Sequence, residues 1–414
     1  MNVQSKPAST LSQCRTCGSK NLFLFLPMGA HPPANMFAKT ADPEQRQPAF
    51  ELNTQACLDC GLIQVADQVP DAFFEDYLYV PSGAATMHEH FAGLASVASE
   101  HADGGLIVDV GCNDGLMLGH AVKAGATVLG IDPAANLAPL AKERGVDVLT
   151  AYFNPETASA VLKDKGPAKV ITTTNTFNHI DDLHGFMDAV LVLLDDDGVF
   201  VIEVPWGKKI VEANQFDNVY HEHMSELSLL SIVRLGQSRG MDVVDVTKLP
   251  VHGGSMRVFM KRASLGQAPA PVVAEMLAEE DTAGLTQRAT YEAFAERVDE
   301  LGRQLKQMLS DIKAEGKTVA AYGAPAKGNT LLNYFGIGAE TLDFVVDKNP
   351  LKQGLFTPGT RLPILSPDVV AERKPDYLLV LAWNFFDEIR DQMSDFEARG
   401  GKFIVPLPMP RLVP

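Results

Sequence analysis

The stretch that decides the fold is LIVDVGCNDGLMLGHAVKAGATVLGID, residues 106–132. Its first five residues, which are apolar except for Asp109, predict a strand buried on both faces. Leu116–Lys123 is predicted to be a helix, and Ala126–Ile131 a second buried strand that ends at Asp132. Strand, small-residue turn, helix, strand and acid make up one half of a doubly wound nucleotide-binding unit. We therefore expect an α/β protein built around a doubly wound sheet.

The turn within this stretch narrows the choice of ligand. Gly111 and Gly115 let the backbone approach a ligand closely, and Asp132 is placed to accept hydrogen bonds from two ribose hydroxyls. Asn113 stands where the dinucleotide pattern G-x-G-x-x-G has its middle glycine, which disfavours a nicotinamide-dependent oxidoreductase. The turn resembles motif I of the class I S-adenosylmethionine methyltransferases. An ordinary βαβ turn without a ligand would carry the same glycines.

Composition excludes several classes of function. The chain has 414 residues, a length typical of about three domains. Its formal net charge of −17 repels phosphate backbones, so nucleic acid is not expected as a partner. No apolar run is long enough to cross a bilayer, no secretion signal is recognised, and five cysteines do not make a secreted disulfide framework. We expect a cytoplasmic protein without a membrane partner.

Two cysteine pairs near the start of the chain predict a metal site. Cys14-Arg-Thr-Cys17 and Cys57-Leu-Asp-Cys60 are each followed by glycine, which suits a tight turn that aims both sulfurs at one ion. Two redox-active pairs are the alternative interpretation. Four thiolates leave no open coordination position, so we predict a structural Zn²⁺ ion that holds together a segment too small for its own core.

Polar residues follow two further predicted strands. Lys169–Thr174 is followed by Asn175 and His179, and Gly198–Pro205 contains Glu203 near its end. In an open α/β sheet, ligands bind outside the carboxyl ends of the strands. We therefore expect these three side chains at the ligand-binding edge.

The segment Tyr220-His221-Glu222-His223 has four consecutive side chains that can exchange a proton or form hydrogen bonds. It precedes an apolar helix predicted over residues 227–235, with Ser225 as the predicted N-cap. The pattern is not HExxH, so a zinc protease is excluded. The two histidines share a face on an extended chain but diverge in a helix, where one would point at the site and the other away. A buried hydrogen-bond network without a catalytic role is the alternative.

The last part of the chain repeats the α/β pattern. A strand containing His252 in its leading turn closes the central region, and apolar residues from Tyr291 to Ile312 predict a long amphipathic helix that packs on its own chain or forms a dimer seam. Strands are predicted over residues 318–322, 342–347, 377–382 and 403–406. The loop 323–329 is predicted to open a helix and to bind a nucleotide diphosphate, with Lys327 as a charge for phosphate. A packing domain without a ligand is the alternative.

Together these motifs resemble the sugar C-methyltransferases that act on nucleotide-activated 4-keto deoxysugars. The resemblance rests on the cysteine pairs and on VDVGCNDG, FNHIDD, YHEH, HGGSMRV and GAPAKGNTLLN. It implies a zinc-binding module at 1–70, a class I methyltransferase domain at 71–262, a linker and long helix at 263–316, and a Rossmann-like nucleotide-sugar domain at 317–414. It also implies S-adenosylmethionine and structural Zn²⁺ as cofactors, a dTDP-linked sugar as partner, and a monomer or homodimer.

The resemblance also assigns site residues. His223 falls on the family's base, with Tyr220, Glu222 and His179 beside it and a tyrosine that falls on Tyr77 or Tyr79. In the implied reaction, a base removes the proton next to the ketone, on C3, and the enolate carbon takes the methyl group. The rivals are an O- or N-methyltransferase on another small substrate and a non-catalytic zinc-stabilised binding protein. The remaining predicted residues are Asp109, Gly111, Asn113, Gly115, Asp132 and Asn175 for the methyl donor, Glu203, His252, Lys327 and Asn329 for the substrate, and Cys14, Cys17, Cys57 and Cys60 for the metal.

Overall fold

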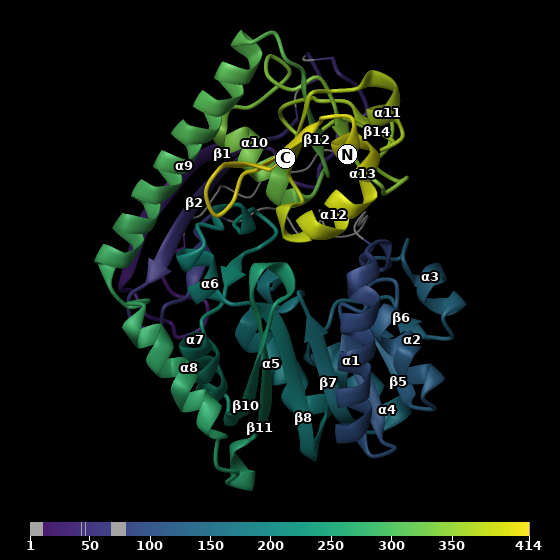
Figure 1. Cartoon of the computed structure of the whole chain (residues 1–414). Coiled ribbons are helices and arrows are strands. Elements are labelled where there is room, and N and C mark those ends of the chain that lie inside the picture. The colour runs from purple at the N-terminus through teal and green to yellow at the C-terminus, as the bar shows by residue number, and fades with distance from the viewer. Residues whose placement is uncertain (1–10, 43, 46, 68–79, 414) are drawn as a thin grey trace.

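The computed structural model describes residues 11–42, 44–45, 47–67 and 80–413. These residues form three sheets of four, seven and six strands. The seven-stranded sheet occupies the lower half of the molecule in Figure 1, the six-stranded sheet lies above it, and the long helix α9 (Arg288–Ala314) runs along one side. The helices are α1 (Ala85–Ala102), α2 (Leu116–Lys123), α3 (Ala138–Glu143), α4 (Pro155–Lys165), α5 (Leu183–Leu193), α6 (Gly207–Glu212), α7 (Leu229–Ser238), α8 (Pro271–Thr282), α9, α10 (Ala326–Phe335), α11 (Val369–Arg373), α12 (Phe386–Gln392) and α13 (Ser394–Ala398).

The seven-stranded central sheet confirms the doubly wound unit. All five residues of the predicted strand at 106–110 are buried, and this strand, β4, pairs in parallel with β5 and β7 on its two sides. β11 is antiparallel to both of its neighbours, β8 and β10. In spatial order the strands are β10 (Met241–Leu249), β11 (Ser255–Arg262), β8 (Leu194–Pro205), β7 (Ala168–Thr174), β4 (Leu106–Val110), β5 (Thr127–Ile131) and β6 (Val148–Leu149).

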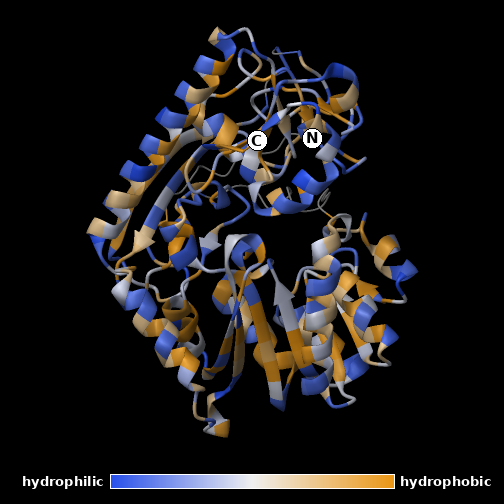
Figure 2. Cartoon of the chain, in the orientation of Figure 1, coloured by the Kyte–Doolittle hydropathy of each residue, from blue (hydrophilic) through white to orange (hydrophobic). Residues whose placement is uncertain are grey.

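Helices cover both faces of this sheet. Val108 on β4 packs in one core with α4, α5 and α7, whereas the neighbouring Ile107 packs in a second core with α1 and α2. Successive strand residues point to opposite faces, and both faces are covered, which explains why four of the five residues of β4 are apolar. Figure 2 shows the same arrangement as hydrophobic strands flanked by helices of mixed hydropathy. No helix within the described ranges has the length and hydropathy needed to cross a membrane.

The four-stranded sheet joins the start of the chain to its middle. It contains β1 (Leu22–His31), β2 (Phe50–Cys57) and β3 (Ile63–Val65), and its last strand is β9 (Ser225–Glu226), which pairs antiparallel with β3. The prediction that Ser225 caps the following helix is wrong, because Ser225 belongs to β9. Helix α7 begins after Ser228, whose side chain accepts a hydrogen bond from the backbone N–H of Ser231.

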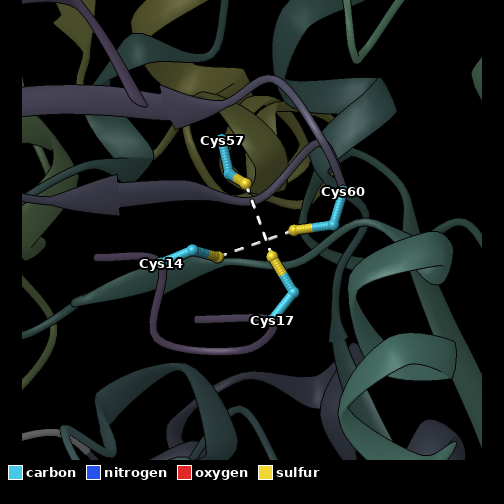
Figure 3. A group of neighbouring side chains, drawn as sticks. All are labelled: Cys14, Cys17, Cys57 and Cys60. Carbon is cyan, nitrogen blue, oxygen red and sulfur yellow. Dashed lines mark hydrogen bonds between the residues drawn. The ribbon is translucent and has the colours of Figure 1, made fainter. Parts of the chain in front are cut away.

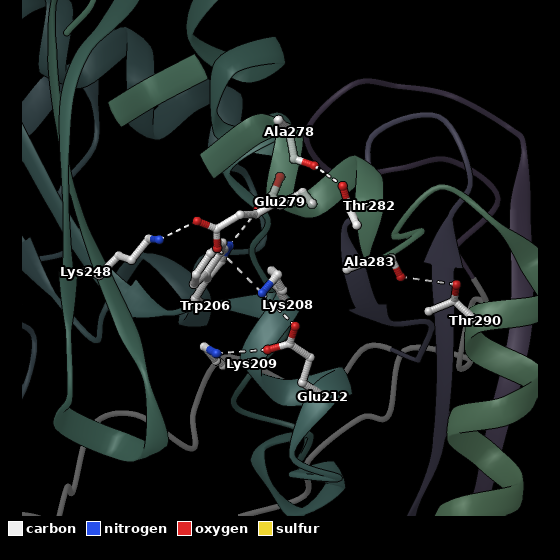
Figure 4. Close-up of polar contacts among 11 residues, drawn as sticks. Trp206, Lys208, Lys209, Glu212, Lys248, Ala278, Glu279, Thr282, Ala283 and Thr290 are labelled. Carbon is white, nitrogen blue, oxygen red and sulfur yellow. Dashed lines mark hydrogen bonds and ion pairs between the residues drawn. The ribbon is translucent and has the colours of Figure 1, made fainter. Parts of the chain in front are cut away.

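Helix α8 is attached to the central sheet by a buried tryptophan. The indole N–H of Trp206 donates to Glu280 at 2.6 Å, and the ammonium of Lys208 lies 4.9 Å from the centre of the Trp206 ring. Figure 4 shows Glu279 between Lys208 and Lys248, with which it forms ion pairs of 3.6 and 2.5 Å. Because α8 leads directly into α9, these contacts fix the direction in which the chain leaves the central sheet.

Helix α9 packs on its own chain, as one of the two interpretations predicted. Its apolar face is buried against β1, where Phe25 contacts Tyr291 and Phe294 with ring centres 5.0 and 5.9 Å apart. The same core contains residues of β12, β15 and α10, so α9 ties the four-stranded sheet to the six-stranded one. This packing leaves the six-stranded sheet facing the carboxyl edge of the central sheet (Figure 1).

The six-stranded sheet is parallel except at one edge. Its strands β13, β12, β15 and β16 pair in parallel, and β17 is antiparallel to β16. Of the strand predicted over 342–347, only Val345–Val346 forms a regular strand. These two residues pair with β12 and β14. In spatial order the strands are β14 (Ile364–Leu365), β13 (Val345–Val346), β12 (Val319–Tyr322), β15 (Tyr377–Val380), β16 (Lys402–Val405) and β17 (Arg411–Val413).

Candidate active site

One cavity of about 1130 Å³ lies between the central sheet and the six-stranded sheet. The carboxyl ends of β4, β5 and β7 form its floor, and the loop after β12 forms part of its roof. A pocket for one small molecule typically measures about 300–1,000 Å³. The cavity is therefore large enough for a cofactor and a second ligand. Of the predicted site residues, Asp109, Gly111, Asn113, Asp132, Asn175, His179, Tyr220, His223, His252 and Lys327 line it.

The loop after β4 is built to hold a ligand against the floor of the cavity. Gly111 has a φ of 78°, and a Cβ added there would lie 2.1 Å from the hydroxyl oxygen of Thr176. The Asp132 carboxylate accepts hydrogen bonds from the backbone N–H groups of Asn113 and Ala134, both at 2.8 Å. Asp132 thus braces the loop while its remaining lone pairs stay available to a ribose. These features fit S-adenosylmethionine, whose ribose and methionyl parts such a loop accommodates.

Three other residues predicted for the cofactor lie beside this loop. Asp109 accepts a hydrogen bond from the Thr172 hydroxyl at 2.7 Å, and burial raises the pKa of its carboxyl to about 7. Asn175 has a φ of 51°, and its buried side-chain oxygen has no hydrogen-bond partner within the described residues, as expected of a group that awaits a ligand. Gly115 caps α2 with a φ of 71° and lies behind the cavity wall rather than in it.

His223 is held by a carboxylate that the sequence interpretation did not assign. Its Nδ1 atom lies 3.0 Å from a carboxylate oxygen of Glu226, and both side chains are buried. The ring of Tyr220 stacks on His223 with a centre-to-centre distance of 4.0 Å, and the ring of His179 meets it edge-on at 4.8 Å. The His223 ring thus has Glu226 at its Nδ1 atom and is also hydrogen bonded to the backbone of Asn218.

Burial keeps these imidazoles neutral. Desolvation lowers the pKa of His223 well below its ordinary value, and the positive charge of Lys327 lowers the pKa further. Desolvation also lowers the pKa of His179, whose ring is hydrogen bonded by the backbone of Asn175 and Glu222. Since only a neutral imidazole accepts a proton, the site is prepared for base chemistry at neutral pH.

The remaining groups of the Tyr-His-Glu-His segment point away from His223. Residues 221–222 form a turn, and the ring of His221 contacts the backbone oxygens of Phe50 and Glu51 on β2 at 3.1 and 3.2 Å. The side chain of Glu222 accepts a hydrogen bond from Asn35 at 2.5 Å, and burial raises its pKa to about 7. The carboxylate that contacts the His223 ring is therefore that of Glu226 and not that of Glu222.

The residues predicted for the substrate fall into two groups. Lys327 and His252 line the cavity, and His252 has a φ of 54° and a buried Nε2 without a partner among the described residues. Glu203 lies behind the wall, where it forms ion pairs with Arg257 at 2.8 Å and with His90. Asn329 also lies outside the main cavity, and its side chain donates to the backbone oxygen of Ala34 at 2.8 Å.

A second carboxylate, that of Asp217, is buried where the charges of Lys327 and Glu226 act on it. Asp217 is fully buried and accepts a hydrogen bond from the indole N–H of Trp383 at 2.7 Å, which links the central region to the six-stranded sheet. Burial raises the pKa of the Asp217 carboxyl to about 6. Neither Asp217 nor Glu226 carried a motif, although both flank the Tyr-His-Glu-His segment within three residues, and that proximity was the available signal. The predicted Tyr77 and Tyr79 lie outside the described residues.

The four cysteines form one cluster. Their sulfur atoms all lie within 4.8 Å of one another, and Figure 3 shows them converging from two turns on a common point. Tetrahedral Zn²⁺ at about 2.3 Å from each sulfur needs neighbouring sulfurs about 3.8 Å apart. The pairs Cys14–Cys60 and Cys17–Cys57 lie at 3.5 and 3.6 Å, so the donor set fits the ion. A single cluster of this shape rules out two separate redox pairs.

Arg15, between two of these cysteines, connects the cluster to the cavity. One guanidinium nitrogen donates to the backbone oxygens of Val65 and Met224 at 2.7 and 3.1 Å. Another nitrogen donates to the carboxylate of Asp181 at 3.0 Å. Met224 follows His223 and Asp181 lies two residues after His179, so Arg15 holds both histidine-bearing loops to the metal cluster.

Comparison with known proteins agrees with this geometry. Residues 14–74 match a family described as a putative zinc binding domain, residues 85–246 a methyltransferase domain, and residues 250–408 a C-methyltransferase C-terminal domain. Together with the doubly wound sheet and the glycine loop, these matches define a methyltransferase that uses S-adenosylmethionine and carries a structural zinc site.

The chain is 39% identical over 407 residues to C-methyltransferase NovU of Streptomyces niveus, which covers 97% of each protein. It therefore belongs to the C-methyltransferase family, as the resemblance indicated. It is also 31% identical over 114 residues to a ubiquinone biosynthesis O-methyltransferase of Bartonella bacilliformis, over 26% of this chain and 46% of that protein. Magnesium protoporphyrin IX methyltransferase of Synechocystis with bound SAM aligns with a TM-score of 0.33 at 13% identity, over 44% of this chain and 80% of that one.

Proposed function

We propose that the protein is a C-methyltransferase whose substrate is a nucleotide-activated 4-keto deoxysugar, with dTDP as the nucleotide and C3 as the methylated carbon. The observation that carries the proposal is the buried pair of His223 and Glu226 at a cavity that also contains the methyl-donor loop. Transfer to oxygen or nitrogen needs no carbon acid. A base held neutral in a dry site is what removal of a proton from carbon requires.

Each residue around the proposed base has a separate role in the proposed proton removal. Glu226, when ionised, accepts a hydrogen bond from the Nδ1–H of His223 and leaves Nε2 to take the proton from the carbon next to the ketone. Tyr220 and His179 hold the imidazole ring between them. When bound, S-adenosylmethionine supplies the electrophilic methyl group. Gly111, Asn113 and Asp132 would hold the methyl donor at the cavity floor, and the sugar would bind on the side of the cavity lined by His223.

The size and lining of the cavity support a nucleotide-linked substrate. Beyond the donor loop, the cavity extends over the carboxyl ends of β12 and β13, where Asp347 and Lys348 line it. Such ends are the usual binding position of a Rossmann-like sheet. We also propose that the segment boundaries lie at residues 70, 262 and 316, that the protein is cytoplasmic, and that it is a monomer or a homodimer.

Proton exchange followed by NMR tests the function. The protein is incubated in D₂O with a dTDP-4-keto-6-deoxyhexose, with and without S-adenosylmethionine. Loss of the C3 proton signal without the donor, and a new methyl resonance with it, are expected. A methyl group that appears on oxygen without any exchange at C3 would favour the O-methyltransferase alternative and overturn the proposal. Failure of both, with the donor bound, would point to a different substrate.

A further inference from the structure

Lys327 brings an amino group into the cavity without bonding it to the protein. The residue lies in the first turn of α10, and its nitrogen is buried and has no hydrogen-bond partner in the described part of the chain. The centre of the Trp383 ring lies 5.7 Å from the nitrogen. A buried ammonium that is left unpaired is strongly destabilising. A ligand group with negative charge would remove that cost.

The position of Lys327 at the start of α10 adds a second source of positive potential. The first turn of α10 exposes backbone N–H groups and carries the positive end of the helix dipole. A cation is unfavourable at this end of a helix, so local stability does not explain the lysine. The charge and the dipole instead add to a positive potential on the cavity side, opposite the negative charge that develops during enolate formation.

Two buried carboxylates stabilise the charge of Lys327 without neutralising it by contact. Burial lowers the pKa of Lys327 below its ordinary value, and the negative charges of Asp217 and Glu226 partly counteract that lowering. One oxygen of each carboxylate is buried and unbonded within the described residues, and neither forms an ion pair with the ammonium. The other oxygen of Asp217 is bonded to Trp383, and the other oxygen of Glu226 to His223. Lys327 is thus held near His223 with its donors free.

We propose that Lys327 is a catalytic residue that binds the ketone oxygen of the substrate and stabilises the enolate. The inference rests on the proposed function. His223 Nε2 takes the proton from the carbon, the electron pair of the broken C–H bond forms the C=C bond, and the carbonyl π pair moves to the oxygen. The ammonium of Lys327 donates a hydrogen bond to that oxygen throughout and keeps its own proton. Positive groups placed where charge develops are among the largest contributions to catalysis.

The alternative is a phosphate contact, which the sequence suggested for Lys327. Lys327 follows β12 directly, but it also lies close enough to the proposed base for its charge to lower the pKa of His223, and close enough to Asp217 and Glu226 for these carboxylates to act on its own pKa. Phosphate binding would affect the affinity for the nucleotide, whereas enolate stabilisation would affect the rate of proton removal. The two roles are therefore separable by experiment.

The test measures C3 proton exchange of a dTDP-4-keto-6-deoxyhexose in D₂O, at saturating sugar, for the wild-type protein and for Lys327→Met. We expect exchange to fall by about 10²–10³-fold, while the affinity for dTDP alone and for S-adenosylmethionine stays within a few-fold of wild type. Lys306→Met, which removes the same charge from the exposed face of α9, is the matched control and should exchange normally. Lys327→Gln is the second variant, for use if the methionine side chain impairs folding.

A double variant with Glu226→Gln separates direct from indirect action. If Lys327 acts on the substrate oxygen, the losses in the single variants multiply in the double variant. If the double variant is no slower than Glu226→Gln alone, Lys327 acts only through Glu226 and the proposal is overturned. Undiminished exchange in Lys327→Met, or weakened binding of dTDP with normal exchange, also overturns it. Absence of exchange in the wild-type protein instead refutes the proposed function, and this inference falls with it.

Discussion

Glu226 holds His223 from a different secondary-structure element than the motif that contains the histidine. The 3.0 Å contact between the carboxylate oxygen and Nδ1 joins the end of a turn to strand β9, which is itself paired with β3. His223, the proposed base, is thus positioned by the four-stranded sheet. This relationship predicts that residues outside the motif control the reactivity of the motif.

Replacement of either member of the pair should reduce C–H bond cleavage to different degrees. A general base contributes about 10²–10⁴-fold, and we expect a loss of that size in His223→Gln. Glu226→Gln keeps a hydrogen-bonding group but loses the charge, so we expect about 10–100-fold, the equivalent of about 1.5–3 kcal/mol. Single-turnover methyl transfer measures both. His184→Gln, on α5 and outside the cavity lining, is the control, and equal loss in the control would indicate a general effect on folding.

The donor loop should not tolerate a side chain at its first glycine. In Gly111→Ala, the added Cβ would lie 2.1 Å from the Thr176 hydroxyl oxygen, and we expect loss of S-adenosylmethionine binding in calorimetry. Gly125→Ala is a matched control, because Gly125 has a similar φ of 86° and no atom within 4 Å of its added Cβ. The control should share any cost of backbone strain but retain binding. Equal binding by both variants would contradict our account of the loop.

The contact between His221 and β2 predicts a pH-dependent contribution to stability. Burial lowers the pKa of His221 to about 4, whereas the unfolded residue titrates near 6.5. Between these values the unfolded state binds the proton and the folded state does not, so the stabilisation by His221 is present above pH 6.5 and is lost toward pH 4. Denaturant unfolding should show the difference between wild type and His221→Gln shrinking by up to about 3 kcal/mol from pH 7.5 to pH 4.5. A difference that does not vary with pH would refute this.

Metal removal should affect turnover more than donor binding. We expect one Zn²⁺ per chain by elemental analysis and its loss in Cys57→Ser, since four thiolates complete the site. The fifth cysteine, Cys112, is buried and outside the cluster, so Cys112→Ser should keep the ion. Because Arg15 holds the loops of His179 and His223, the metal-free protein should lose methyl transfer while the donor loop still binds its ligand. Full activity without zinc would contradict this connection.

Local pattern was sufficient for most of the fold but not for contacts between distant segments. The apolar runs of β4, β5, β7 and β8 and the glycine loop predicted the central sheet, because each of these elements is buried by neighbours close in the chain. Strand β9 could not be predicted, since Ser225 and Glu226 become a strand only through pairing with β3. For the same reason, the contact of the Glu226 carboxylate with the His223 ring could not be predicted.

The contacts of the charged residues also could not be predicted from the sequence. Lys327 was interpreted from its glycine-rich neighbours as a phosphate contact, and nothing near it in the chain indicates that the charges of Asp217 and Glu226 act on it. Glu203 follows the rule for strand ends, yet Arg257 on the adjacent antiparallel strand turns it into an ion pair behind the wall. Pairing between strands decides which polar residues reach a ligand.

The sharing of one sheet by β3 and β9 also sets an order of events during synthesis. Residues 14–65 leave the ribosome before the segment that contains His223, so the cysteine cluster can capture its ion and form a sheet while the catalytic segment is still being made. Until residues 225–226 arrive, the outer edge of β3 is an open strand edge of the kind that invites pairing with other chains. The pairing of β3 with β9 in the folded chain covers that edge, so completion of this sheet depends on residues 225–226.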